Sequence, residues 1–218
     1  MAPALLRYYR LLRKHFGPQG WWPGRTRFEI ILGALLTQHT AWKNVRKALE
    51  NLREAGLLSP HKLSRVSLAR LNRYLRPSGT YRQKSRMVQR FLRFLNENYG
   101  GTLEWMFRLP SWHLRAELLQ LPGVGPETAD AILLYAGGHP AFVIDAYTRR
   151  ILQRHGLAHG RESYDRLQEL FESQLPRDAV LYNEYHALLV AAGKTYCHRR
   201  NPDCTNCPLG AEMESKAV

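Results

Sequence analysis

The stretch Leu121-Pro-Gly-Val-Gly125, followed by Pro126-Glu-Thr-Ala-Asp-Ala-Ile-Leu-Leu-Tyr135, decides the fold of this chain. It predicts the end of one helix, a tight turn and a second helix, because Gly123 and Gly125 can adopt the positive φ angles that such a turn needs. Pro126 suits the first turn of the second helix, where its missing N–H group costs nothing. The free N–H groups and the dipole at that helix start predict an anion site.

A large excess of positive charge predicts an acidic partner. The 218 residues include 32 Lys and Arg against 18 Asp and Glu, which gives a net charge of +14. Nucleic acid is the expected partner, because its phosphates attract Lys and Arg regardless of sequence. A basic protein without such a partner is the alternative that charge alone leaves open. The anion at the hairpin is therefore predicted to be a nucleic-acid phosphate.

Composition and segment lengths exclude several other classes of protein. Hydrophobic residues make up 44% of the chain, enough for one large domain or two small lobes with a proper core. No apolar run approaches the roughly 20 residues of a membrane span, and the basic N-terminus lacks an apolar signal core. We therefore expect a cytoplasmic, monomeric protein with no membrane partner. All three cysteines lie between positions 197 and 207, which does not resemble a disulfide framework.

Helical periodicity runs through the chain, and no segment alternates as a strand would, so the fold is predicted to be all-α. A strongly apolar helix is expected over 28–40, ending in the polar cluster Thr37-Gln-His-Thr40. The turn Arg76-Pro-Ser-Gly79 should precede a long basic helix that reaches about Tyr99. Asp145 follows an apolar pair and is the expected N-cap of the next helix.

Three pieces of sequence together resemble the helix-hairpin-helix superfamily of DNA glycosylases, with the endonuclease III branch closest in overall order. They are Leu121-Pro-Gly-Val-Gly-x-x-Thr-Ala129, Val143-Ile-Asp145 and Cys197-x6-Cys204-x2-Cys207-Pro208. Within the superfamily the chain is most similar to 3-methyladenine DNA glycosylase III. The matching segments there include Trp21-Trp-Pro23, Leu32-Gly-Ala-Leu-Leu-Thr-Gln38 and Arg76-Pro-Ser-Gly79.

The resemblance implies two helical lobes and a C-terminal Cys-containing loop. One lobe, over 25–140, is a helical barrel that contains the hairpin at about 111–136. The second joins residues 1–24 to 141–218 and carries the Cys loop over 194–213. Double-stranded DNA with a damaged base is the implied partner, and the flipped nucleotide would enter between the lobes.

The resemblance also assigns the chemistry. Asp145 matches the essential Asp that stabilises positive charge on the sugar while the N-glycosidic bond breaks. Members with lyase activity carry a Lys, which forms a Schiff base, at the position held here by Glu127. The segment from Ser111 to Asp145 contains no Lys. The expected enzyme is therefore a monofunctional glycosylase that uses water as its nucleophile.

Aromatic residues are the expected base-binding groups: Trp21, Trp22, Pro23 and Trp42. A base between Trp21 and Trp42 would be held mainly by π-stacking, which suits a positively charged alkylated purine. Core packing of both Trp side chains is the alternative.

Several further residues are expected to contact DNA. Gln38 matches the residue that fills the space left by the flipped base, and Thr80 or Tyr81 occupies the region of a second wedge. Gly123, Val124 and Gly125 should hold one phosphate, and the hairpin carbonyls could take a monovalent cation. Lys194 is expected in or near the pocket, or on a phosphate.

The cysteine pattern departs from the family at one position. The family's [4Fe-4S] loop is Cys-x6-Cys-x2-Cys-x5-Cys, and Cys197, Cys204 and Cys207 match its first three ligands. Met213 stands at the fourth position. One interpretation is a [4Fe-4S] cluster with an unusual fourth ligand. The other is a relic loop, or a zinc site that includes His198.

Three functions follow from these residues. The first is excision of alkylated purines such as 3-methyladenine. The second is an endonuclease III-like glycosylase that acts on oxidised pyrimidines, and the third is a non-catalytic DNA-binding protein that uses the hairpin alone. Both enzyme functions require the Asp145 carboxylate for base release, whereas the non-catalytic function does not. Substitution of Asp145 therefore discriminates between them.

Overall fold

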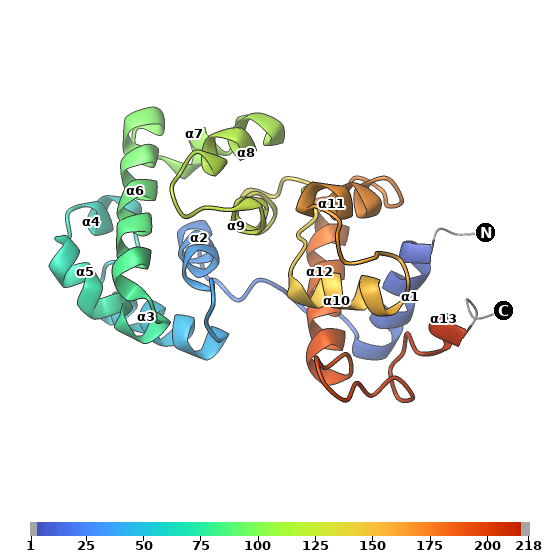
Figure 1. Cartoon of the computed structure of the whole chain (residues 1–218). Coiled ribbons are helices and arrows are strands. Elements are labelled where there is room, and N and C mark those ends of the chain that lie inside the picture. The colour runs from blue at the N-terminus through green and yellow to red at the C-terminus, as the bar shows by residue number, and fades with distance from the viewer. Residues whose placement is uncertain (1–3, 215–218) are drawn as a thin grey trace. The chain divides into compact units, whose positions relative to one another are not determined.

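The structure is a computed structural model that describes residues 4–214, and over that range it contains helices and no strand (Figure 1). The prediction of an all-α fold is confirmed. The α-helices are α1 (Ala4–Phe16), α2 (Arg27–Leu36), α3 (Trp42–Glu54), α4 (Pro60–Ser64), α5 (Leu68–Leu75), α6 (Tyr81–Tyr99), α7 (Leu103–Met106), α8 (Ser111–Leu119), α9 (Pro126–Ala131), α10 (Ala146–Arg154), α11 (Tyr164–Glu172), α12 (Ala179–Thr195) and α13 (Ala211–Glu214). A short 3-10 helix, η1 (Arg76–Ser78), precedes α6, and a π-helix, η2 (Ile132–Gly137), continues α9.

The chain forms two compact units. Unit 1 combines the residues up to Trp21 with those from Pro140 onward, and unit 2 is the continuous segment Trp22–His139. Residues 1–3 and 215–218, the ends of the predicted second lobe, lie outside the described range. None of the described helices has the length and apolar character that a membrane crossing requires.

Unit 2 is built around α2. This helix is apolar on nearly all sides, and a helix of that kind is stable only inside a core. Its residues Phe28, Ile31, Leu32 and Leu35 are buried, and it packs against α3, α6, α9 and η2. The hairpin and the long helix α6 therefore share one core.

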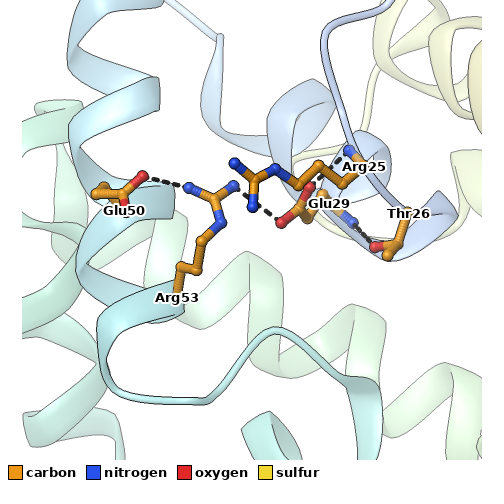
Figure 2. A network of polar contacts seen from close by, with 5 residues as sticks. All are labelled: Arg25, Thr26, Glu29, Glu50 and Arg53. Carbon is orange, nitrogen blue, oxygen red and sulfur yellow. Dashed lines mark hydrogen bonds and ion pairs between the residues drawn. The ribbon is translucent and has the colours of Figure 1, made fainter.

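A capping network begins α2 and fixes the chain just before it (Figure 2). The Thr26 hydroxyl accepts a hydrogen bond from the Glu29 amide at 3.2 Å, as expected of an N-cap residue. The buried Glu29 carboxylate accepts bonds from the Arg25 amide at 2.7 Å and from the Arg53 guanidinium at 2.9 Å. Arg53 also pairs with Glu50 on α3. The segment that follows Trp22 is thereby tied to α3.

The end of α2 differs from the prediction. The helix was expected to reach Thr40, but it ends at Leu36, so the expectation for 37–40 is wrong. The Thr37 hydroxyl donates to the Gly33 carbonyl at 2.6 Å, and His39 adopts a left-handed φ of 51°. Hydrogen bonding of a Thr side chain to the preceding turn competes with helix continuation. The polar cluster consequently lies on a loop.

Unit 1 is built around α12, which packs against α1 and α10. The Tyr185 hydroxyl donates to the Leu5 carbonyl at 2.8 Å. Phe142 and Phe171 stack with ring centroids 4.0 Å apart. The Tyr185–Leu5 bond joins the N-terminal helix to the C-terminal third of the chain, and the packing of α10 on α12 places the helix that begins after Asp145 on the central helix.

Candidate active site and DNA-binding residues

The hairpin turn uses one positive φ angle, not two. Gly123 has φ of 98°, whereas Gly125 has φ of −95°, an extended conformation that other residues adopt as well. The expectation that both glycines take positive φ angles is therefore wrong for Gly125. The Val124 amide donates to the Leu121 carbonyl at 2.9 Å, which closes the turn. Gly125 is the N-cap residue of α9, and Pro126 occupies its first turn, as predicted.

A buried ion pair, which the sequence reasoning missed, joins the two hairpin helices. Nε of Arg115 on α8 lies 2.8 Å from Oδ1 of Asp130, and Nη2 lies 3.2 Å from Oδ2. Asp130 is fully buried, so this bidentate pairing compensates for the desolvation of its carboxylate. An Asp in the middle of an apolar helix is the signal that could have revealed it.

Gln38 is already bound to the hairpin. Its amide donates to the Gly123 carbonyl at 2.9 Å and to the Thr128 hydroxyl at 3.1 Å. The carbonyl of Gly123 is one of those predicted to face a monovalent cation, and Gln38 occupies one of its acceptor positions. The loop after α2 and the hairpin are thus linked directly.

Thr80 and Tyr81, the predicted second wedge, lie at the start of α6. Thr80 is exposed and has a left-handed φ of 33°, an unusual conformation for a β-branched residue. Tyr81 is half-buried, and the Arg82 guanidinium lies 5.7 Å from the centre of its ring.

The predicted base-binding aromatics fall into two groups. In unit 2, Trp22 packs edge-to-face on Trp42, with ring centroids 5.3 Å apart. Both rings lie close to Gly33, where any Cβ atom would come within 3.3 Å of Trp42 and 3.0 Å of Trp22. Pro23 is exposed in a turn closed by a 2.9 Å bond from the Gly24 amide to the Trp22 carbonyl.

Trp21 belongs to unit 1, where its half-buried ring faces Lys194. The Lys194 ammonium lies 5.8 Å from the ring centre, within the range of a cation–π contact. Lys194 is exposed near the end of α12. Two residues that are far apart in the sequence are therefore brought together, and the sandwich of a base between Trp21 and Trp42 stays a prediction.

Asp145 is confirmed as the N-cap residue of α10. Its Oδ1 accepts a hydrogen bond from the Thr148 amide at 2.7 Å, which orients the carboxylate. The side chain is 13% exposed. One oxygen of a mostly buried carboxylate is thus held by the main chain of a helix.

The second oxygen of Asp145 faces a residue that the sequence reasoning missed. Nε2 of His186 on α12 lies 3.7 Å from Oδ2 of Asp145. Burial lowers the pKa of His186, although the neighbouring Asp145 raises it in part. A histidine in the otherwise apolar stretch of α12 was the available signal, but its partner could be found only from the packing of α12 on α10.

The three cysteines line one pocket in unit 1. Its wall also includes Arg154, His155, Tyr196, Asp203, Gly210 and Met213. The Arg154 guanidinium donates to Sγ of Cys197 at 2.9 Å. Burial raises the pKa of the Cys207 thiol, and the nearby Cys197 and Cys204 thiols raise it further. The loop closes tightly, because a Cβ atom at Gly210 would lie 2.2 Å from the Cys204 carbonyl oxygen.

Three cysteine sulfurs line this pocket, and thiolate sulfur is the ligand type that iron–sulfur clusters use. Within residues 4–214, no three His, Cys, Asp or Glu side chains converge closely enough to hold one metal ion. Soft sulfur donors are also the ligands that zinc accepts, so the lining is compatible with either group. Met213 also lines the pocket, whereas the described lining does not include His198, the alternative zinc ligand.

Glu127 lies exposed on the first turn of α9. A carboxylate there favours the positive end of the helix dipole, and it cannot act as an amine nucleophile.

Comparison with known proteins places these features in a repair family. Residues 32–177 match the HhH-GPD superfamily of base excision DNA repair proteins. A protein of Methanocaldococcus jannaschii, provisionally named a DNA repair glycosylase, is 43% identical over 206 residues, covering 94% of this chain and 93% of its own length.

Two solved structures resemble this fold. The Helicobacter pylori 3-methyladenine DNA glycosylase bound to 1,N6-ethenoadenine is 28% identical with a TM-score of 0.75, over 87% of this chain and 97% of that chain. A non-covalent endonuclease III–DNA complex is 26% identical with a TM-score of 0.80, over 100% of this chain and 99% of that chain.

Proposed function

Because this chain belongs to the HhH-GPD superfamily of base excision DNA repair proteins, we propose that it is a monofunctional DNA glycosylase. The enzyme would hydrolyse the N-glycosidic bond of a damaged base flipped out of duplex DNA. One observation carries the proposal: the Asp145 carboxylate is held at the start of α10 by the Thr148 amide, with His186 beside its second oxygen.

Asp145 supplies the electrostatic part of the chemistry. When the bond from the sugar C1′ to the base nitrogen breaks, its electron pair leaves with the base and positive charge develops on the sugar. A preoriented carboxylate stabilises that charge without having to reorganise. Water then forms the new bond to C1′ and loses a proton, which the carboxylate can accept.

The absence of a lysine on the hairpin supports hydrolysis without strand cleavage. A Schiff base requires an amine at C1′. Position 127 carries Glu, and the segment 111–145 has no Lys. The sugar is therefore left as an abasic site.

Three segments of unit 2 would contact the DNA. The Gly123-Val-Gly125 turn and the start of α9 would hold one phosphate, because the first N–H groups of a helix have no acceptor within it. Gln38 would fill the space left by the flipped base, and Thr80 or Tyr81 would enter from the second loop. From unit 1, Lys194 would contribute near the base or a phosphate.

An alkylated purine such as 3-methyladenine is the proposed substrate. Trp21, Trp22 and Trp42 offer π surfaces, and a positively charged base stacks strongly on an electron-rich ring. The glycosidic bond of such a base is already weak, so little acid catalysis is needed.

One observation favours a second candidate, an oxidised pyrimidine. The Lys194 ammonium lies 5.8 Å from the Trp21 ring centre. A cation at that place disfavours a second cation on the same ring, so a neutral base would be accepted more readily there.

We further propose that Cys197, Cys204 and Cys207 hold a [4Fe-4S] cluster, with Met213 at the fourth position. The cluster would supply a structural cross-link, and the reaction itself requires no electron transfer from it. Its role would be to hold the basic residues Arg199 and Arg200 in one loop conformation.

A base-release assay tests the proposal. Duplexes carrying 3-methyladenine, 7-methylguanine, hypoxanthine or an oxidised pyrimidine are compared at equal enzyme concentration. We expect fastest release of the alkylated purines. Asp145→Asn should reduce release by about 100-fold or more, the scale of a preorganised electrostatic contribution.

Asp178→Asn is the matched control. Asp178 is the N-cap residue of α12 and accepts bonds from the Val180 and Leu181 amides. Asn is as good an N-cap residue as Asp, so both variants should fold and only the change at position 145 should stop release. Unchanged release by Asp145→Asn would overturn the catalytic role of Asp145. If the wild-type protein releases no base from any of these duplexes, a non-catalytic DNA-binding protein is the remaining function.

A further inference from the structure

A buried ammonium lies between two loops of unit 2. Lys84, in the first turn of α6, is 3% exposed. Its Nζ donates to the Leu36 carbonyl at 2.9 Å and to the Ser78 carbonyl at 2.6 Å. One side chain therefore bridges the end of α2 and the end of η1.

The two acceptors explain why a lysine can be buried here. Leu36 is the last residue of α2, and carbonyls at a helix C-terminus lack intrahelical partners and carry the negative end of the dipole. Ser78 ends η1. Burying a charge without such partners would be costly, and an apolar side chain would leave both carbonyls without this donor.

The bridged elements lead directly into strained backbone. Beyond Leu36 the loop reaches His39 with φ of 51°, and beyond Ser78 it reaches Thr80 with φ of 33°. Asn201 is the one other non-glycine residue with positive φ in the described part of the chain. A left-handed conformation is unfavourable for a non-glycine residue and persists only where the surroundings impose it.

We propose that Lys84 is a positioning residue that fixes the spacing between the Gln38 loop (37–40) and the Thr80 loop (79–81). This inference rests on the proposed function, in which both loops enter the duplex at the flipped nucleotide. Gln38 is itself bound to the Gly123 carbonyl, so Lys84 and Gln38 together link both loops to the hairpin.

Lys84 would act on base extrusion and leave general DNA affinity unchanged. Phosphate contacts position a protein on DNA regardless of sequence, and they do not need the two loops at a set distance. Replacing the ammonium with a methionine side chain keeps most of the buried volume but removes the donors from both carbonyls.

The test compares Lys84→Met with Lys62→Met, which removes an exposed lysine on α4. Lys84→Met should release base at least about tenfold more slowly under single turnover, the scale of a lost buried hydrogen-bonding group. Its affinity for undamaged duplex should stay within about threefold of wild type. Hydrogen exchange should increase at 37–40 and 79–81. Lys62→Met should change none of these.

Two further measurements keep the proposal falsifiable. If Lys84→Met does not fold, Lys84→Gln is the second variant, because its side chain is too short to span both carbonyls. It should also release base more slowly and keep its affinity for undamaged duplex. Wild-type release rates and unchanged loop exchange in a folded Lys84 variant would overturn the proposal. If the wild-type protein releases no base at all, the proposed function fails, and loop exchange alone then decides whether Lys84 fixes the loops.

Discussion

In the proposed function, the residue at position 127 determines the class of reaction. It lies on the first turn of α9, immediately after the turn that would hold a phosphate. At this place a Lys would bring an amine to the sugar, whereas in the proposed reaction Glu127 would leave water as the nucleophile.

We expect that borohydride will not trap the wild-type protein on abasic DNA, and that Glu127→Lys will raise trapping about tenfold or more by supplying the amine. The measurement is the fraction of enzyme–DNA adduct on a denaturing gel. Glu104→Lys, at an exposed position on α7, is the control for added charge. Efficient trapping of the wild-type protein would contradict a monofunctional reaction.

His186 predicts a dependence of stability on pH. Burial lowers its pKa below the ordinary value, so the folded state binds this proton less readily than the unfolded state. Stability is therefore full above the unfolded pKa of about 6.5 and falls as pH decreases toward the folded pKa. His186→Gln should reduce the loss of unfolding free energy between about pH 7 and pH 5.

Denaturant unfolding at several pH values measures this effect. His61→Gln, at an exposed position on α4, is the control. Its unfolding free energy should depend on pH as that of the wild-type protein does. If the unfolding free energy of His186→Gln falls with pH as steeply as that of the wild-type protein, another group causes the acid sensitivity.

At the scale of elements, the start of α2 depends on a carboxylate that is almost fully buried. Glu29 is 4% exposed and joins the Arg25 amide to Arg53 on α3 (Figure 2). Gly24, just before this network, approaches α2 so closely that a Cβ atom would lie 2.6 Å from Ile30. The segment that follows Trp22 is thus fixed by the Glu29 network and by the close packing of Gly24 on Ile30.

Arg53→Met should lower the unfolding free energy by roughly 2–4 kcal/mol, because it leaves the buried Glu29 carboxylate without its charged partner. Glu50→Gln removes only the exposed partner of Arg53 and should cost less than about 1 kcal/mol. Denaturant unfolding of both variants checks the difference. Equal losses would show that Glu29 gains little from Arg53.

At the scale of the whole molecule, unit 1 is assembled from both ends of the chain. Arg7 on α1 pairs at 2.7 Å with Glu212, which lies near the end of the Cys loop (194–213). His15 and Tyr196 are also joined, with Nε2 and the hydroxyl 2.9 Å apart. A group bound in the Cys pocket would therefore stabilise the unit at the place where its two segments meet.

Protein purified without oxygen should be brown, absorb at about 400 nm and contain about four iron atoms per chain. Cys207→Ser should lose the iron and lower the melting temperature. Met213→Cys, which completes the four-thiol pattern, should retain iron longer in air. His198→Ala should leave the iron content unchanged. Colourless, iron-free wild-type protein would refute the cluster.

The sequence by itself determined the helical class, the hairpin turn and the N-cap role of Asp145. These features are local: periodicity, glycine conformations and capping act over a few neighbouring residues. The repair family could also be predicted from the sequence, because the hairpin, Asp145 and the cysteine spacing are all short sequence motifs.

Only the tertiary structure decided which side chains meet. It brought His186 to Asp145, Arg115 to Asp130, Lys194 to Trp21 and Lys84 to two separate carbonyls. It also ended α2 at Leu36, four residues before the expected point. Such pairings depend on how distant helices pack, and neither periodicity nor propensity along one segment contains that information.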